Sequence, residues 1–272
     1  MSSPQALLVF PAVAYLVSAV LYLWRVLRRS PVAGLWGFVV ALVGALVQAG
    51  VLVARFHADP QAVVAGVTDA ASALSFFTVV GFLVGERLFG IGALGSAVMP
   101  LAFGGLLIGI LSPAERPVPE VLRSPWFFLH VPPSLLAYVA FAFAFGAAAV
   151  YLSEAKLLRS KRIAAVLGTL PPLDELEHLM YRTAAFGFLL LTIGIATGGV
   201  WAQEAWGRYW SWTPKQSVSL VTWLLFATYL HNRVIRGSRA RSGAWIIIIG
   251  FLSCLVTFLA VGLLKQDPHR FL

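Results

Sequence analysis

Aromatic and basic side chains crowd residues 201–216, a short segment between two long apolar runs. They are Trp201, Trp206, Arg208, Tyr209, Trp210, Trp212 and Lys215. Indole rings settle where an apolar region meets water, and each indole N–H needs a hydrogen-bond acceptor. An aromatic belt that anchors two helices would need only one or two of these rings at each helix end. The density of rings therefore predicts a flat, π-rich platform at a membrane boundary.

The chain has five histidines, which are the candidate metal ligands: His57, His130, His178, His231 and His269. A histidine within or beside an apolar span is a functional candidate, although many such residues only cap a helix end. His130 and His269 are expected on the same membrane face as the aromatic segment. Two imidazoles on opposite sides of a porphyrin ring would make a bis-histidine haem site. Four basic residues could pair with the haem propionates, namely Arg116, Arg123, Arg208 and Lys215.

His231 is expected far from this platform. It follows Gln216 by 15 residues, which is about 22 Å along a straight helix. A haem at His231 would therefore occupy a second site near the other membrane face. This chain would supply one imidazole to that site, and a partner would supply the second ligand.

The composition indicates a membrane protein. Apolar residues make up 60% of the chain and charged residues 11%, against about 45–50% and 25% in soluble domains. Eight apolar runs approach the length that crosses a bilayer, and lipid allows such runs only as helices. These runs are 6–27, 33–54, 64–85, 92–111, 126–153, 181–200, 217–235 and 243–264. We predict an all-α, polytopic membrane helix bundle of about eight transmembrane helices.

The basic residues predict the orientation of this bundle. Of the 20 Lys and Arg residues, 13 fall in connections on one side and 7 on the other. The richer side should be cytoplasmic, which puts both termini and the aromatic segment outside. The net charge of +9 is then a property of basic loops beside lipid and is no sign of nucleic-acid binding. We expect a multi-pass protein of the plasma or inner membrane, with its first span retained.

One membrane domain, residues 1–272, is the simplest organisation. The spans within 1–111 carry few polar groups, and most candidate chemistry lies in 126–272. Before the sixth span, residues 173–181 have the pattern of a separate short amphipathic helix on the inner membrane surface. Cys254 is the only cysteine, which excludes a disulfide within the chain and a Cys-x-x-Cys-His haem attachment motif.

Several segments together resemble one known family. Residues 201–216 match the pattern Trp-Ala-x-x-x-Trp-Gly-x-Tyr-Trp-x-Trp-Asp-Pro-Lys-Glu, and residues 229–233 read Tyr-Leu-His-Asn-Arg. Further matches are the Gly-rich stretch 192–199, His130 with Ala137-Tyr138, Val256-Thr257-Phe258, and the sequence from His269 to Phe271. The chain thus resembles the cytochrome c assembly family of membrane haem-handling proteins, which includes CcsA, CcmC and HemX-type members. The resemblance covers about 126–272, and the first four spans match only loosely.

The resemblance implies a membrane haem-delivery factor for cytochrome c maturation. Haem b would be bound transiently at the tryptophan platform and presented at the outer face to apocytochrome c. By position, His130 and His269 match the family's external ligands, and His231 matches its in-membrane ligand. A CcsB-like membrane partner would complete the machine.

The chain departs from the family motif at two positions, where Thr213 and Gln216 replace an aspartate and a glutamate. Thr213 still suits a helix N-cap, and Pro214 then takes the first helical position. The loss of both carboxylates leaves a second hypothesis open, that of a HemX-like membrane accessory or regulator of haem biosynthesis.

A third hypothesis is a small-molecule transporter with an aromatic gate, but paired intramembrane carboxylates and matching broken helices are not visible in the sequence. The sequence also shows no constellation of catalytic acid, base or nucleophile. The chain would position haem while the apocytochrome thiols react. The role of His57 stays open.

Overall fold

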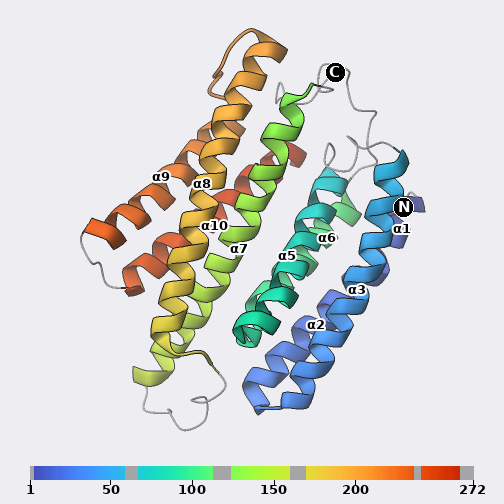
Figure 1. Cartoon of the computed structure of the whole chain (residues 1–272), viewed down its shortest axis with the longest axis vertical. Coiled ribbons are helices and arrows are strands. Elements are labelled where there is room, and N and C mark those ends of the chain that lie inside the picture. Colours follow the sequence, from blue (N-terminus) through green and yellow to red (C-terminus); the bar gives the residue numbers. More distant parts are fainter. Residues whose placement is uncertain (1–2, 59–66, 113–123, 160–169, 236–239, 264–272) are drawn as a thin grey trace. The chain divides into compact units, whose positions relative to one another are not determined.

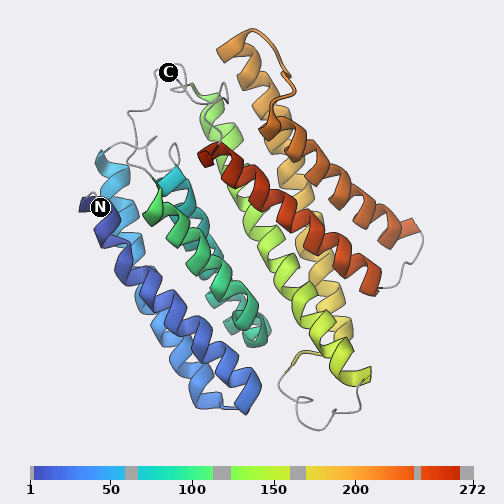
Figure 2. The same cartoon turned by 180° about the vertical axis from the view of Figure 1, so that it is seen from behind.

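The computed structural model describes residues 3–58, 67–112, 124–159, 170–235 and 240–263. Within these ranges the regular secondary structure is helical (Figures 1 and 2). The elements are α1 (Ser3–Leu7), α2 (Val9–Arg28), α3 (Pro31–Ala58), α5 (Val67–Phe89), η1 (Gly92–Leu94), α6 (Gly95–Leu111), α7 (Trp126–Arg159), α8 (Leu173–Trp206), α9 (Pro214–Ile235) and α10 (Ala240–Leu263).

Among the described residues, seven helical stretches are long and apolar enough to cross a membrane. The prediction of an all-α, polytopic membrane bundle is therefore confirmed. The run predicted as a span at 217–235 corresponds to α9, a helix of 22 residues that is less apolar than the seven. Its crossing of the bilayer stays a prediction, as do the outside positions of the two termini.

The separate surface helix predicted for 173–181 is wrong, because α8 is continuous from Leu173 to Trp206. No glycine or proline interrupts the chain between Leu173 and Phe186, so nothing in the backbone ends the helix there. Leu176, Met180 and Ala184 form a buried stripe at helical spacing. The stripe runs from the first turns of α8 into its apolar span without a break. With 34 residues, α8 is about 51 Å long and exceeds the ~30 Å hydrocarbon core of a bilayer.

The chain divides into two compact units. Unit 1 comprises Met1–Arg116 and Gly146–His178, and unit 2 comprises Pro117–Phe145 and Leu179–Leu272. The long helices α7 and α8 contribute residues to both units. The predicted single membrane domain stays a prediction.

Close helix packing in unit 1 depends on small residues of α3. A Cβ atom on Gly37 would lie 3.1 Å from Cε2 of Tyr22, and one on Gly44 would lie 2.9 Å from Cβ of Ala14. The glycines thus let α3 approach α2 more closely than larger side chains would allow. Such contacts replace the hydrophobic driving force that helices lack in lipid.

Buried hydrogen bonds join three helices of unit 1. The hydroxyl of Tyr15 in α2 donates to Oε1 of Gln48 in α3 at 2.5 Å. Nε2 of Gln48 lies 3.0 Å from both the carbonyl oxygen and Oγ of Ser72 in α5. In the last turn of α3, Arg55 forms an ion pair with the fully buried Asp69 of α5. The polar groups of these spans are therefore few but paired across helices.

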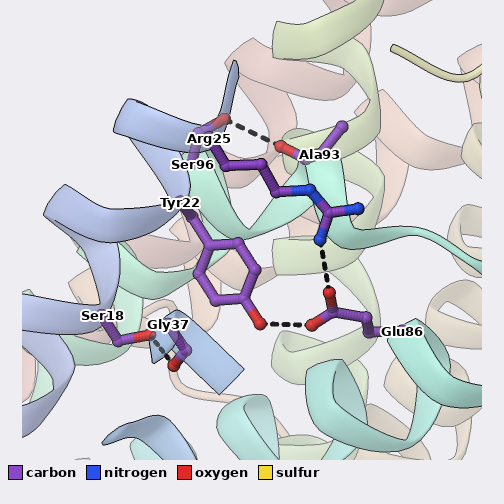
Figure 3. A network of polar contacts seen from close by, with 7 residues as sticks. All are labelled: Ser18, Tyr22, Arg25, Gly37, Glu86, Ala93 and Ser96. Carbon is purple, nitrogen blue, oxygen red and sulfur yellow. Dashed lines mark hydrogen bonds and ion pairs between the residues drawn. The ribbon is translucent and has the colours of Figure 1, made fainter. Parts of the chain in front are cut away.

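A second polar cluster of unit 1 lies where α2 and α5 end (Figure 3). Nη1 of Arg25 lies 2.7 Å from Oε1 of Glu86, and the Tyr22 hydroxyl donates to the other carboxylate oxygen. A Cβ atom on Gly92 would lie 2.5 Å from Oε1 of Glu86. Only glycine therefore lets η1 pack directly against this ion pair.

Aromatic stacking holds the core of unit 2. The rings of Phe141 in α7 and Phe226 in α9 are nearly parallel, with centroids 3.6 Å apart. Phe145 lies against Phe251 of α10, with ring centroids 4.8 Å apart. Thr222 of α9 donates a hydrogen bond of 2.8 Å to Ser253 of α10. These contacts fix the helices that carry the candidate site.

Candidate functional site

The tryptophan-rich segment, 201–216, begins as the last turns of α8, continues as a loop and ends in the first turn of α9. α8 ends at Trp206, and the following Gly207 has a φ of 72°, the left-handed conformation that glycine adopts without strain. The loop then folds back toward α8, since a Cβ atom on Gly199 would lie 3.6 Å from the carbonyl oxygen of Tyr209. The loop residues thus lie beside the end of their own helix.

The start of α9 confirms the predicted N-cap. The backbone N–H of Gln216 donates to Oγ1 of Thr213 at 3.3 Å, and Pro214 is the first helical residue. The Gln216 side chain makes a second contact, because its Oε1 accepts a 2.8 Å hydrogen bond from the backbone N–H of Ser211. Gln216 therefore supplies the acceptor oxygen that a glutamate would supply, without its charge.

The aromatic rings of the segment divide into exposed and half-buried groups. Tyr209 and Trp212 are 62% and 70% exposed, whereas Trp201 and Trp210 are half-buried. Within the described residues, Nε1 of Trp201 and Nε1 of Trp210 are buried without a hydrogen-bond partner. Trp212 has a φ of 52°, which is uncommon for a bulky residue and marks a constrained loop. The segment thus combines exposed ring faces with unused indole donors.

His130 lies at the tryptophan-rich segment. Its ring centroid is 5.7 Å from that of Trp201, and Nδ1 is 2.7 Å from the carbonyl oxygen of Gly194. A carbonyl can only accept, so Nδ1 carries a proton, and in the neutral imidazole Nε2 then carries the lone pair. Metal-bound histidines commonly donate their other ring N–H to a backbone carbonyl in this way. A Cβ atom on Gly198 would lie 2.7 Å from Nδ1, so the imidazole fits only against glycine.

The backbone around His130 is tied to α8. Pro133 lacks an N–H, so the carbonyl of Leu129 has no helical donor, and Oγ1 of Thr197 in α8 lies 3.2 Å from that oxygen. The carbonyl of His130 accepts a hydrogen bond of 2.7 Å from Oγ of Ser134. Near the start of α7, Oγ of Ser124 donates to the carboxylate of Glu204 in α8 at 2.9 Å. These contacts hold His130 in a defined position beside α8.

The remaining predicted residues do not all join this site. Arg208 is exposed, and Trp206 and Lys215 are half-buried in the same segment. His231 is exposed near the other end of α9, 17 residues and about 25 Å after Pro214. His269, Arg116 and Arg123 lie outside the described residues. The meeting of His130 with His269 therefore stays a prediction.

Sequence reasoning missed the residues of α8 that position His130. Gly194, Thr197 and Gly198 entered only as part of a Gly-rich motif, although their spacing places all three on one helical face. It also missed the structural role of Gln216, whose partner Ser211 is five residues away in the loop.

These features define a polytopic helical membrane protein with a histidine held beside a tryptophan-rich segment. The model of the family described as Cytochrome C assembly protein matches residues 34–269. The chain therefore belongs to this family. The match extends well into the N-terminal spans, which resemble the family only loosely in their motifs.

Individual relatives agree with the family. The chain is 31% identical over 225 residues to the cytochrome c biogenesis protein CcsA of Trieres chinensis, covering 73% of this chain and 72% of the relative. It is 34% identical over 196 residues to the same protein of a Synechococcus strain, covering 64% of this chain and 63% of the relative. The match thus spans about two thirds of these relatives.

A solved structure titled cytochrome c haem lyase CcmF shares the fold. Its TM-score is 0.69 at 17% sequence identity, and the match covers 95% of this chain but 47% of that one. The similarity extends the fold assignment over nearly the whole chain.

Proposed function

We propose that this chain is a membrane haem-binding and haem-delivery factor for cytochrome c maturation, which presents haem at the outer face to apocytochrome c. The observation that carries the proposal is the hydrogen bond from Nδ1 of His130 to the carbonyl oxygen of Gly194. It orients the ring, and in the neutral imidazole it leaves the lone pair on Nε2, the atom with which His130 would ligate iron. Membership of the cytochrome c assembly family supports haem as the group handled.

The side chains of the tryptophan-rich segment are chemically suited to bind haem b. The exposed faces of Tyr209 and Trp212 offer apolar contact to a porphyrin ring. The buried indole N–H groups of Trp201 and Trp210 lack acceptors within the described residues, and propionate oxygens are acceptors of this kind. Arg208 is exposed nearby in sequence and would pair with the same propionates, as would Lys215. His269 would be the second residue to hold the iron.

The chain's contribution to the reaction is positional. Haem b supplies two vinyl groups, and the thiol S–H of each apocytochrome cysteine adds across one vinyl double bond to form a thioether. His130 and the indole donors would hold the ring so that its vinyl edge stays accessible. The proposal requires no catalytic acid or base from this chain.

A second haem site would involve His231 and a CcsB-like membrane partner. The exposed residues of α9 include Val221, Leu224, Thr228, His231 and Ile235. Their spacing of three and four residues puts them in one stripe along the helix. A partner helix packed on this stripe would supply the ligand opposite His231.

A haem-binding measurement on the purified full-length chain tests the proposal. We expect a Soret band in the wild type that shifts or disappears in His130→Ala. The control is His178→Ala, which changes an exposed histidine at the start of α8 and should leave the spectrum unchanged. An identical Soret band in wild type and His130→Ala would refute the site.

The orientation of the segment and the process served need separate tests. We propose that the segment lies on the non-cytoplasmic side of the plasma or inner membrane, because the opposite connections hold more Lys and Arg. Loss of holocytochrome c on deletion of the gene, with normal total haem, would support delivery. A drop in total haem would support the alternative of a HemX-like regulator of haem biosynthesis.

A further inference from the structure

Four arginines and a single glutamate gather at the α2–α3 hairpin end of unit 1. Arg25 and Arg28 lie in the last turn of α2, Arg29 is its left-handed C-cap residue, and Arg87 lies in the last turn of α5. The 2.7 Å contact between Arg25 and Glu86 brings the ends of these two helices together. The cluster therefore has a clear excess of positive charge.

The guanidinium of Arg25 forms an ion pair with Glu86, whereas Arg28 and Arg87 contact aromatic rings. The guanidinium carbon of Arg28 lies 5.3 Å from the centroid of the Trp24 ring, and that of Arg87 lies 4.2 Å from the centroid of Phe38. A guanidinium held over an aromatic ring by a cation–π contact can still donate N–H hydrogen bonds in its own plane. Among the described residues, neither group has a carboxylate within ion-pair distance.

The surroundings of these two arginines are those of a lipid boundary. Trp24 and Trp36 are each more than half exposed, as are the apolar side chains of Leu27, Leu88 and Phe89. Tryptophan is enriched at the depth of lipid headgroups, and exposed aliphatic side chains at a helix end face the acyl region. The guanidinium edges are thus expected at the depth of the lipid phosphates.

We propose that the hairpin cluster (Arg28 and Arg87) binds the headgroup of an anionic phospholipid. A planar guanidinium donates two parallel hydrogen bonds to phosphate oxygens. The excess of positive charge selects an anionic lipid over a zwitterionic one. The ion pair between Arg25 and Glu86 has a different role, because it joins α2 to α5 and so sets the spacing of Arg28 and Arg87. This inference does not depend on the proposed haem site.

Native mass spectrometry of the full chain, released from detergent micelles that contain phosphatidylglycerol and phosphatidylcholine, tests the proposal. We expect the wild type to retain phosphatidylglycerol preferentially. Replacing both stacked arginines (Arg28→Gln with Arg87→Gln) should weaken this retention about thirtyfold, the effect of removing two surface arginines at an anionic membrane. The control Arg182→Gln removes an exposed arginine of α8 and should retain the lipid as the wild type does.

Two further measurements complete the test. Arg28→Lys keeps the charge but loses the planar guanidinium, so its retention of phosphatidylglycerol should fall below that of the wild type. This comparison tests the proposal even if the double variant does not fold. Inorganic phosphate at millimolar concentration should not displace the lipid, because the acyl chains contribute to binding. Equal retention of the two lipids by the wild type, or full displacement by inorganic phosphate, would overturn the proposal.

Discussion

Nδ1 of His130 in α7 lies 2.7 Å from the carbonyl oxygen of Gly194 in α8. This contact needs glycine again one turn later, because a Cβ atom on Gly198 would lie 2.7 Å from the same nitrogen. The position of the imidazole therefore depends on the surface of α8 as much as on α7. Substitutions on α8 can therefore separate the positioning of the imidazole from the stability of the fold.

Gly198→Ala should displace the His130 ring and weaken or shift the Soret band. The backbone of the variant should not lose stability, because alanine is more favourable than glycine within a helix by about 1 kcal/mol. Gly199→Ala is the matched control, since its Cβ atom would lie 3.6 Å from the nearest atom, an ordinary contact. Absorbance and thermal denaturation of both variants check this. Equal Soret bands in the two variants would contradict the role given to Gly198.

Trp201→Phe should weaken haem binding about tenfold, the loss expected when a ligand acceptor loses a hydrogen bond of ~1.4 kcal/mol. Because Nε1 of Trp201 has no hydrogen-bond partner within the described residues, the change removes no hydrogen bond of the protein there, and it keeps an aromatic ring beside His130. The control is Trp223→Phe, because Nε1 of Trp223 donates to Oγ1 of Thr192 at 3.0 Å. That variant should lose stability while keeping haem affinity, as measured by haem titration and thermal denaturation.

Gln216→Glu should leave the loop intact, because a carboxylate oxygen accepts from the Ser211 N–H as the amide oxygen does. Gln216→Leu removes the acceptor and should cost about 1–3 kcal/mol of stability if the Ser211 N–H is left unsatisfied. Haem titrations and denaturation curves of both variants check this. If Gln216→Leu is as stable as wild type, Gln216 does not hold the loop.

The sequence allowed the helices to be predicted wherever the membrane leaves no alternative. Each apolar run became a helix because lipid offers no partner for an open backbone, and Thr213 with Pro214 marked the start of α9 through their local chemistry. The residues at which the helices begin and end were less predictable. Hydropathy separated residues 173–181 from the span, but α8 continues through them because no backbone signal ends the helix.

The contacts that position the site were not predictable, because they join residues far apart in the chain. His130 could be identified as a candidate from its place beside a span, but not its bond to Gly194, 64 residues away. In the same way, Gln48 and Glu86 are bonded to residues far away in the sequence. Their partners, Tyr15 and Tyr22, are known only once α2 is packed against α3 and α5.

Glu86→Gln should destabilise unit 1, because the Arg25 guanidinium loses its charged partner. Arg25 is about one-third exposed, so water screens the change, and we expect a loss of about 1–2 kcal/mol rather than the 3–5 kcal/mol of a fully buried pair. A double-mutant cycle with Arg25→Gln, followed by thermal denaturation, measures the coupling. Additive effects of the two substitutions would mean that the pair contributes nothing to stability.

Cysteine labelling can test the orientation of the tryptophan-rich segment, because the chain's own cysteine is expected not to react. Cys254 is 2% exposed, so the wild type should not react with a membrane-impermeant maleimide. The variant Arg208→Cys places a thiol at an exposed loop position and should be labelled in intact spheroplasts, since this face is expected to be non-cytoplasmic. Arg182→Cys, at an exposed position on the side predicted to be cytoplasmic, should be labelled only after the membrane is opened. The reverse pattern would invert the topology and exclude delivery of haem at the outer face by this segment.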